Sequence, residues 1–387
     1  MKKTIYPNTT GIFSILLWFL FITFSISAQN KNGSKVQIFH IQNYFTESYL
    51  VKGNSEKLIL IDTGVPVAGY QDTLVSAVKK LGFKPENIAL TIVTHGHGDH
   101  TGNARFLQQN FKTKIAGSKA DLDKFTSGKT ELSKSEDVSI WGSRLRPYCD
   151  LDYPAFTPDI IVENANIDLK KYGFDGKIIP IKGGHTPGDL LILIGDNLFV
   201  GDAFVGTFKA KGGGLAPDGH HVREHFYHEN KQLADQNLKL IEKIALDNKV
   251  KTIYPTHNGP VSTSELTKYI KEEPLLRLLS QQNETILSDV LKGKSDFQNY
   301  LSDRFVLQTS DKKYSKVTFP EAYTISKTKI ESLAAEDFRI VSSDENKAVL
   351  TFIENIKFEG KEAKTAFVIE NYSKEKGSWK IVKKEVN

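Results

Sequence analysis

A run of seven residues, Thr94-His95-Gly96-His97-Gly98-Asp99-His100, limits this chain more than any other feature of its sequence. It places four potential metal ligands within six positions, although histidine supplies only 10 of the 387 residues. By chance, such a pattern is expected in about one chain in a few thousand. Gly96 and Gly98 allow the backbone to bend, so that the imidazoles and the carboxylate converge. The run therefore predicts a metal-binding loop.

Three further candidate ligands stand where other predicted strands end. His185 lies in Gly183-Gly184-His185-Thr186-Pro187-Gly188-Asp189, Asp202 follows the apolar run 198–200, and His257 follows a predicted strand at 252–254. Side chains at the carboxyl ends of strands leave the packed interior and can share one cleft. Each residue alone is more simply explained as a cap or a turn residue. Together with the seven-residue run, they predict one metal centre.

The apolar pattern predicts a mixed α/β domain over residues 29–265. Short apolar runs between residues 35 and 62 alternate with polar turns, which favours a β-meander. Segments with helical spacing then alternate with strand-like runs, as in α/β folds. Helices are predicted at 70–81, 104–109 and 223–246, and strands at 88–93, 114–116, 177–181, 190–194, 198–200 and 252–254.

The composition changes after His257, and we predict a separate, smaller α+β domain at residues 266–387. A helical pattern runs from Glu265 to Lys292 and is interrupted at Pro274. Strands are predicted at 347–358, 364–372 and 378–386, with turn signals between them. A helical start followed by a curved sheet resembles, in pattern only, the nuclear-transport-factor-2-like (NTF2-like) superfamily.

The ligand pattern resembles that of the metallo-β-lactamase fold superfamily over about residues 35–265. The resemblance implies an αββα sandwich with two zinc ions (Zn2+) at one edge. It also matches Asp62, in Ile61-Asp62-Thr63-Gly64, to a residue that orders the ligand loop, although Asp62 alone is also explained as a turn cap. The implied ligands are His95, His97 and His185 for a first zinc, Asp99, His100 and His257 for a second, and Asp202 as a bridge between both.

This resemblance implies a hydrolase that cleaves an ester, lactone, thioester or amide of a small molecule. Zinc lowers the pKa of bound water from 15.7 to about 7, which provides hydroxide for attack on a carbonyl carbon, and Asp99 is the candidate proton shuttle. Because it includes both His100 and Asp202, the ligand pattern resembles that of lactonases and glyoxalase-II-type thioesterases more than that of true β-lactamases. The commonest of those use a cysteine late in the chain, whereas Cys149 precedes His185.

Two alternatives remain beside this interpretation. One is a β-lactam hydrolase of the same fold. The other is a ligand- or partner-binding module with a degenerate metal domain, although the intact ligand set argues against degeneracy. A nucleic-acid substrate is not expected, because the chain has no dense block of basic residues.

Residues 1–28 have the pattern of a cleavable signal peptide. Lys2 and Lys3 precede an apolar run, Gly11 to Phe24, that is shorter than the roughly 20 residues of a membrane span, and small residues follow. An uncleaved anchor is the alternative. We expect a periplasmic or secreted protein without membrane attachment after signal removal, with a net charge reduced from +5 to +3. Its one cysteine excludes an internal disulfide, and its oligomeric state is not predicted.

Three other segments each allow two interpretations. Residues 127–159 read as a polar loop whose aromatic residues either contact substrate or pack on the domain beneath. Gly212-Gly213-Gly214 either flanks a site or only connects two elements. His221, His225 and His228 would share one face of the helix predicted at 223–246, where they either approach the site or pack.

Overall fold

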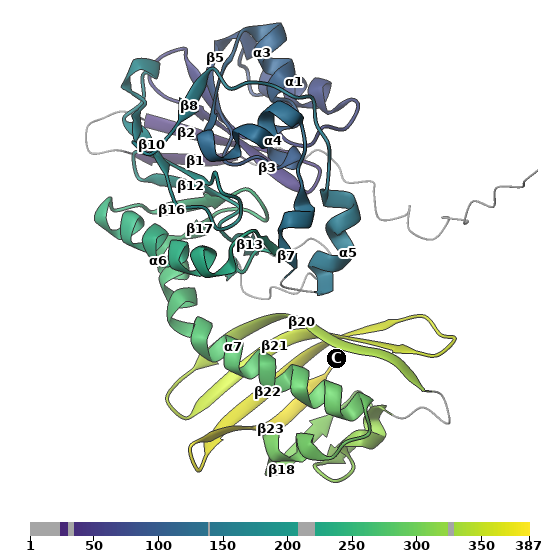
Figure 1. The fold of residues 1–387 in the computed structure, drawn as a ribbon. Helices are drawn as coiled ribbons and strands as arrows, with labels where there is room; N and C mark the ends of the chain where they lie inside the picture. Colours follow the sequence, from purple (N-terminus) through teal and green to yellow (C-terminus); the bar gives the residue numbers. More distant parts are fainter. Residues whose placement is uncertain (1–23, 30–34, 138–139, 208–220, 324–328) are drawn as a thin grey trace, which may run out of the picture. The chain divides into compact units, whose positions relative to one another are not determined.

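The computed structural model describes residues 24–29, 35–137, 140–207, 221–323 and 329–387 (Figure 1). Residue contacts divide the chain into two compact units. Unit 1 comprises residues 1–136, 145–206 and 227–261, and unit 2 comprises residues 137–144, 207–226 and 262–387. The glycine run 212–214 lies outside the described residues.

The first sheet of unit 1 has seven strands in the order β1-β2-β3-β4-β5-β6-β8. The first four pair antiparallel, which confirms the predicted meander, and β4, β5, β6 and β8 run parallel. β1 overlaps the predicted signal peptide, so cleavage after Ala28 would remove all of this edge strand except Gln29. The strands are β1 (Phe24–Gln29), β2 (Lys35–Asn43), β3 (Thr46–Lys52), β4 (Leu58–Ile61), β5 (Ile88–Ile92), β6 (Lys114–Ser118) and β8 (Ile160–Val162).

The second sheet of unit 1 has six strands in the order β17-β16-β12-β11-β10-β9. β9 to β12 pair antiparallel, whereas β12 and β16 run parallel. The strands are β9 (Ile167–Asp168), β10 (Gly176–Pro180), β11 (Leu190–Ile194), β12 (Asn197–Gly201), β16 (Thr252–Pro255) and β17 (Val261–Ser262).

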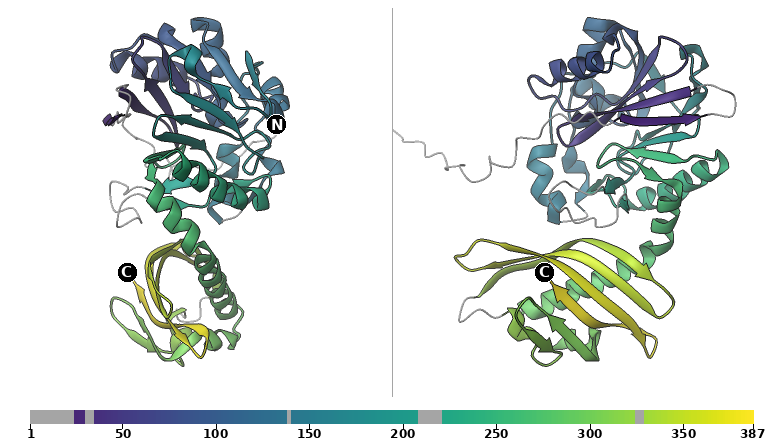
Figure 2. Two further views of the ribbon diagram at one scale, coloured as in Figure 1. Left: turned by 90° about the vertical axis from the view of Figure 1, so that its left-hand side faces the viewer. Right: turned by 180° about the vertical axis from the view of Figure 1, so that it is seen from behind.

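Alternating side chains place the two sheets face to face between helices, which gives the predicted αββα order of layers. In β4, Ile59 and Ile61 join the core between the sheets, whereas Leu58 and Leu60 pack with the helices on the other face. Helices α1 (Tyr70–Lys80) and α3 (Ala104–Phe111) cover the first sheet, and α6 (Lys231–Asp247) lies against the second (Figures 1 and 2).

Residues 127–159 are not one polar loop, as the sequence suggested, because they include α5 (Ile140–Cys149) with Pro147 in its last turn. Tyr153 and Phe156 are buried in a cluster with Phe125, so they follow the packing interpretation. The other short elements are α2 (Gly98–Thr101), α4 (Leu122–Ser127), the 3-10 helices η2 (Pro85–Asn87), η3 (Lys119–Asp121), η4 (Leu132–Lys134) and η5 (Lys170–Tyr172), and the strands β7 (Glu136–Asp137), β13 (Val205–Thr207), β14 (His221–Arg223) and β15 (Tyr227–His228).

The prediction of a helix from residue 223 is wrong, because α6 begins at Lys231. Asn230 caps this helix by accepting a hydrogen bond from the Leu233 N–H at 3.0 Å. His221 and His228 lie in the short strands β14 and β15 instead. The three histidines therefore do not share a helical face.

Residues 262–387 of unit 2 form a long helix and a six-stranded sheet in the order β19-β18-β23-β22-β21-β20. The helix α7 (Thr263–Leu291) continues through Pro274, where an interruption was predicted. One proline removes a single backbone donor, and the buried contacts of Leu279, Ile286 and Leu287 with the sheet stabilise the helix around it (Figure 2). The remaining elements are η6 (Asp296–Tyr300), β18 (Leu301–Gln308), β19 (Lys313–Ser315), η7 (Phe319–Tyr323), β20 (Ile330–Ser343), β21 (Lys347–Phe358), β22 (Lys364–Glu375) and β23 (Ser378–Val386).

Among the described residues, no helix is both long enough and apolar enough to cross a membrane.

Candidate metal centre

The histidine-rich run lies at the carboxyl end of β5, as predicted. His95 and His97 occupy the loop after the strand, and the single turn α2 carries Asp99 and His100. All four side chains are buried, with at most 6% of their surface exposed. A Cβ atom at Gly98 would lie 2.3 Å from the Leu151 carbonyl oxygen, so only glycine permits this close approach of two backbone segments.

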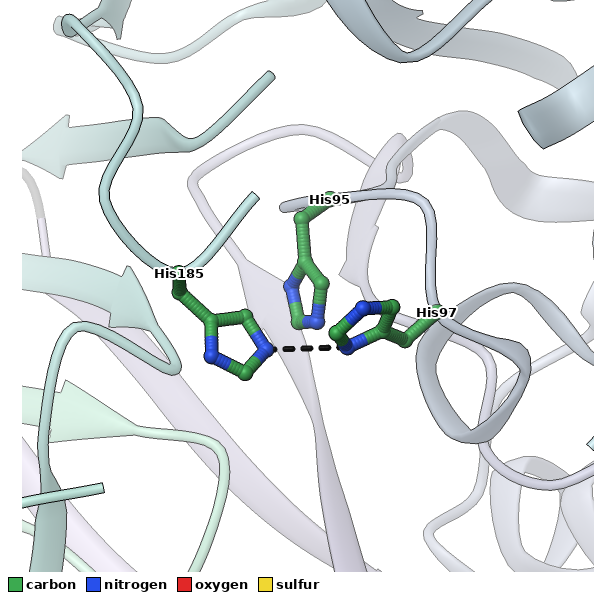
Figure 3. A group of neighbouring side chains, drawn as sticks. All are labelled: His95, His97 and His185. Carbon is green, nitrogen blue, oxygen red and sulfur yellow. Dashed lines mark hydrogen bonds between the residues drawn. The ribbon is translucent and has the colours of Figure 1, made fainter. Parts of the chain in front are cut away.

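His95, His97 and His185 form a first group of candidate ligands (Figure 3). One ring nitrogen from each histidine lies within 4.8 Å of those of the other two. His185 Nε2 is 2.9 Å from His97 Nδ1, although 88 residues separate the two in sequence. Two nitrogen lone pairs at this distance repel each other unless a proton or a metal cation lies between them.

Asp99, His100 and His257 form a second group. Asp99 Oδ2 is 3.3 Å from His100 Nε2 and 3.4 Å from His257 Nε2. Asp202 joins both groups, because its Oδ2 lies 3.2 to 3.8 Å from the Nε2 atoms of four histidines: His95, His100, His185 and His257. The structure thus brings together all seven residues that the sequence singled out.

The Nδ1 atoms of the same four histidines are held by acceptors outside the cluster. His185 Nδ1 donates to the Tyr227 carbonyl oxygen and His257 Nδ1 to that of Phe45, both at 2.8 Å.

The other two histidines are anchored through Asp62. His100 Nδ1 donates to Asp62 Oδ2 at 2.9 Å. The Thr94 hydroxyl donates to Asp62 at 2.8 Å, so its oxygen is free to accept from His95 Nδ1 at 3.1 Å. Because Nδ1 carries the proton in all four rings, the lone pair of each neutral ring lies on Nε2 and faces the cluster.

Burial and charge move the pKa values of these groups in opposite directions. Burial lowers the pKa of His97 to about 3 and takes that of His95 well below its usual value. Burial also disfavours the charged forms of His100 and His257. However, the carboxylates of Asp202 and Asp99 outweigh it, raising the pKa of His257 to about 10 and that of His100 well above its usual value.

The donor set fits divalent metal ions. Imidazole nitrogens and carboxylate oxygens are ligands of zinc and similar cations. Within the part of the chain that the structure describes, the buried Nε2 atom of His95 has no hydrogen-bond partner. A bound cation would satisfy this atom, and it would replace the protons that His100 and His257 hold in its absence.

Comparison with known proteins assigns the family. Residues 42–257, more than half of the chain, match the family model of the metallo-beta-lactamase superfamily. The chain belongs to the metallo-beta-lactamase superfamily. Members of this superfamily are generally hydrolases and typically bind metal, which agrees with the buried His/Asp groups of this chain.

Several proteins of the metallo-beta-lactamase superfamily are similar to this chain. Hydroxyacylglutathione hydrolase GloC of Haemophilus influenzae is 29% identical over 174 residues, which cover 43% of this chain and 73% of the relative. A beta-lactamase from Chitinophaga pinensis is 21% identical, covering 57% of this chain and 75% of its own, with a TM-score of 0.39. BJP-1, a subclass B3 metallo-beta-lactamase of Bradyrhizobium japonicum, is 20% identical, covering 64% of this chain and 92% of its own, with a TM-score of 0.42.

Buried carboxylates that the sequence did not reveal support the ligand loops of this metallo-beta-lactamase domain. Asp121 accepts from the Gly96 N–H at 2.7 Å, and Glu47 accepts from the Gly259 N–H at 3.1 Å. Asp189 accepts from the N–H groups of residues 184–186 at 2.9 to 3.0 Å. Burial raises the pKa of Asp121 to about 6 and that of Asp189 to about 7. Only Asp189 had a sequence signal, because it closes the glycine-rich segment around His185.

Asp62 orders the ligand loop of the metallo-beta-lactamase domain, and its removal is expected to weaken metal binding. It accepts hydrogen bonds from the Thr94 N–H, the Thr94 hydroxyl and His100 Nδ1, at 2.7 to 2.9 Å. We expect Asp62→Ala to lower metal affinity by about 10- to 100-fold. Unfolding of the metal-free chain should also become easier by about 1 to 3 kcal/mol, since a buried N–H loses its partner.

Asp62→Asn is the matched control for this prediction. Asparagine retains an acceptor oxygen and tolerates the left-handed backbone at this position, where φ is 57°. Metal affinity, measured by competition with a chromophoric chelator, should fall less in Asp62→Asn than in Asp62→Ala. Equal affinity of the wild type and Asp62→Ala would contradict the assignment.

Proposed function

We propose that this chain is a binuclear zinc hydrolase that cleaves an ester, lactone, thioester or amide of a small molecule. The observation that carries the proposal is the orientation of four histidine rings. Their Nδ1 atoms are bonded outward, and their Nε2 atoms face Asp202 and Asp99. Without a metal, the neutral ring of His95 would keep a buried Nε2 lone pair that has no hydrogen-bond partner among the described residues, which is unfavourable.

In this proposal the two groups of residues hold one zinc each. Zinc ions held there would supply Lewis acidity, which activates water near pH 7 and polarises a carbonyl group. His95, His97 and His185 would hold the first, Asp99, His100 and His257 would hold the second, and Asp202 would contribute to both.

The chain's own residues position the reacting groups and move the proton. Asp99 is the proposed proton shuttle, since its carboxylate belongs to the second group and is ionised. Burial raises its pKa, but the charges of His100 and His257 outweigh that effect and lower it overall. Asp202 is held in place by the Thr256 hydroxyl, which donates to its Oδ1 at 2.6 Å. The burial of these carboxylates strengthens their interactions with charge by excluding water.

Hydroxyacylglutathione is the first substrate to test, because the relative with 29% identity is a hydroxyacylglutathione hydrolase. Lactones follow from the resemblance of the ligand pattern to that of lactonases. A β-lactam is the alternative substrate of the same fold. A nucleic-acid substrate is not part of the proposal.

Export and the role of unit 2 complete the proposal. The pattern of residues 1–28 supports a cleaved signal peptide and a periplasmic or secreted location. The helix and six-stranded sheet of unit 2 support the resemblance to the NTF2-like superfamily, and we propose that this unit is the chain's second domain.

Metal removal and restoration test the proposal. The purified full chain is assayed against hydroxyacylglutathione, a lactone, a β-lactam and a phosphodiester, before and after treatment with a chelator. We expect turnover of one carbonyl substrate to fall by about 100-fold or more on zinc removal and to return with zinc but not with magnesium.

Three results would change the proposal. Full turnover by a preparation shown to hold no metal would exclude it. Preferred cleavage of the β-lactam would show that the chain is a β-lactam hydrolase, which is the alternative proposed above. Zinc uptake without turnover of any substrate would favour the binding module.

A further inference from the structure

Asp121 lies directly beneath the two loops that carry the three-histidine group. It ends the 3-10 helix η3 that follows β6, and its side chain is fully buried. Its Oδ2 accepts from the Gly96 N–H and from the Thr186 hydroxyl, both at 2.7 Å. Gly96 stands between His95 and His97, and Thr186 follows His185. One carboxylate oxygen therefore connects the backbone beside two histidines with the side chain beside the third.

The close fit around Asp121 explains glycines in both loops. A Cβ atom at Gly96 would lie 3.1 Å from Asp121 Oδ2 and 2.7 Å from Lys124 Cδ. A Cβ atom at Gly188 would lie 2.4 Å from Asp121 Cγ. Real Cβ contacts are essentially never as short as the 2.4 Å at Gly188 or the 2.7 Å at Gly96, so a larger residue in either loop would displace Asp121 or Lys124.

A second set of contacts holds the His185 loop against the same support. The Thr186 hydroxyl also lies 3.0 Å from Asp189 Oδ1, and Asp189 accepts from the His185 N–H. Lys124 Nζ pairs with Glu229 Oε1 at 2.8 Å, and the Glu229 N–H donates to the His185 carbonyl oxygen at 3.0 Å. The His185 backbone is thus fixed on both sides, and Asp121 connects it to the loop of His97.

We propose that Asp121 is a positioning residue that sets the separation of His97 and His185, and thereby the metal affinity of the three-histidine group alone. This inference rests on the metal-binding part of the proposed function. Among the described residues, the hydrogen bonds of Asp121 go to Gly96 and Thr186 and not to the side chains of the second group. Its Oδ1 is buried and has no hydrogen-bond partner in the described segments, so the bonding role belongs to Oδ2.

The test compares Asp121→Ala with Asp121→Asn in the full chain. Alanine removes both hydrogen bonds, whereas the oxygen of asparagine can take the place of Oδ2 and accept both. The exposed neighbour Asp123 provides the matched control Asp123→Ala. The affinities of the two zinc equivalents are measured separately by competition with a chromophoric chelator, and the cobalt-loaded protein gives a spectrum for each site.

We expect Asp121→Ala to lower the affinity for one of the two zinc equivalents by about 10- to 100-fold. The affinity for the other zinc equivalent should stay within about threefold of the wild-type value. Asp121→Asn and Asp123→Ala should both stay within about threefold of the wild type. If Asp121→Ala fails to fold, Thr186→Val replaces it in the test. This variant removes the hydrogen bond from the Thr186 hydroxyl to Asp121 but keeps the one from the Gly96 N–H. It should lower the affinity for the same zinc equivalent.

Three results would overturn the inference: equal weakening of both equivalents, no change in Asp121→Ala, or equal losses in Asp121→Asn and Asp121→Ala. A wild-type chain that binds no zinc would instead overturn the proposed function. The two failures are therefore distinguishable.

Discussion

Asp202→Ala is expected to lower kcat/KM by about 1,000-fold or more and to reduce the bound metal in both groups. Asp202 Oδ2 is the atom that lies within 3.8 Å of histidine nitrogens from both groups. Its removal takes away the shared ligand and half of the carboxylate charge that Asp99 and Asp202 provide. The remaining histidines would then hold cations against unbalanced positive charge.

Two variants make this prediction specific. Asp202→Asn keeps the shape of the side chain but not its charge, and we expect an intermediate loss of metal and turnover. Asp175→Ala removes an exposed carboxylate from the same domain and should leave kcat/KM unchanged. Steady-state kinetics and elemental analysis on the same preparations provide both readouts. Wild-type turnover by Asp202→Ala would show that the cluster does not carry the chemistry.

Lys384→Met is expected to destabilise unit 2 by about 3 to 5 kcal/mol. Lys384 is 1% exposed and lies inside the core, where Nζ contacts Glu354 Oε2 at 2.5 Å and Glu370 Oε1 at 3.5 Å. It also donates to the Tyr323 hydroxyl at 3.0 Å. Without the ammonium group, two buried carboxylates lose their cation, and this costs more than the gain from burying a methionine.

The destabilisation should depend on pH in a defined direction. Burial already raises the pKa of Glu370, although Lys384 opposes this effect. Removal of Lys384 raises the pKa of Glu370 further. At a pH between the unfolded and the folded pKa of Glu370, the folded state therefore keeps a proton that the unfolded state has released. A carboxyl whose folded pKa is raised loses stability as pH rises, so Lys384→Met should be closer to the wild type at pH 5 than at pH 8.

Urea denaturation of the full chain at both pH values measures this effect. The neighbouring Lys383→Met, whose side chain is about half exposed, should change stability by less than about 0.5 kcal/mol. Adding Glu354→Gln and Glu370→Gln to Lys384→Met should recover part of the loss. An unchanged unfolding midpoint in Lys384→Met would contradict the account of this core.

Much of the metal centre could be predicted because its ligands follow strands with strong local signals. Asp202 directly follows β12, and the run at residues 94–100 and His257 each begin two positions after the end of β5 and β16. Asp121 and Glu47 could not be predicted in the same way. Asp121 meets Gly96 and Thr186 across 25 and 65 residues, and nothing near it in sequence distinguishes it from an ordinary acidic residue.

The sheet of unit 2 shows why some strands escape prediction. β20 has no regular alternation of apolar and polar residues, because its pairing with β21 shifts register in three places. Its segment Leu333-Ala334-Ala335-Glu336 also favours a helix by propensity. β18 pairs with β23 through a similar shift between Leu301 and Val306. The regular strands β21, β22 and β23 were predicted, with β22 extending three residues further than expected.

The zinc content of the purified full chain tests the central claim most directly. After dialysis against metal-free buffer, elemental analysis should find about two zinc ions per wild-type chain and far fewer in Asp202→Ala. A folded wild-type chain that hydrolyses a carbonyl substrate and yet holds no divalent metal would contradict the account.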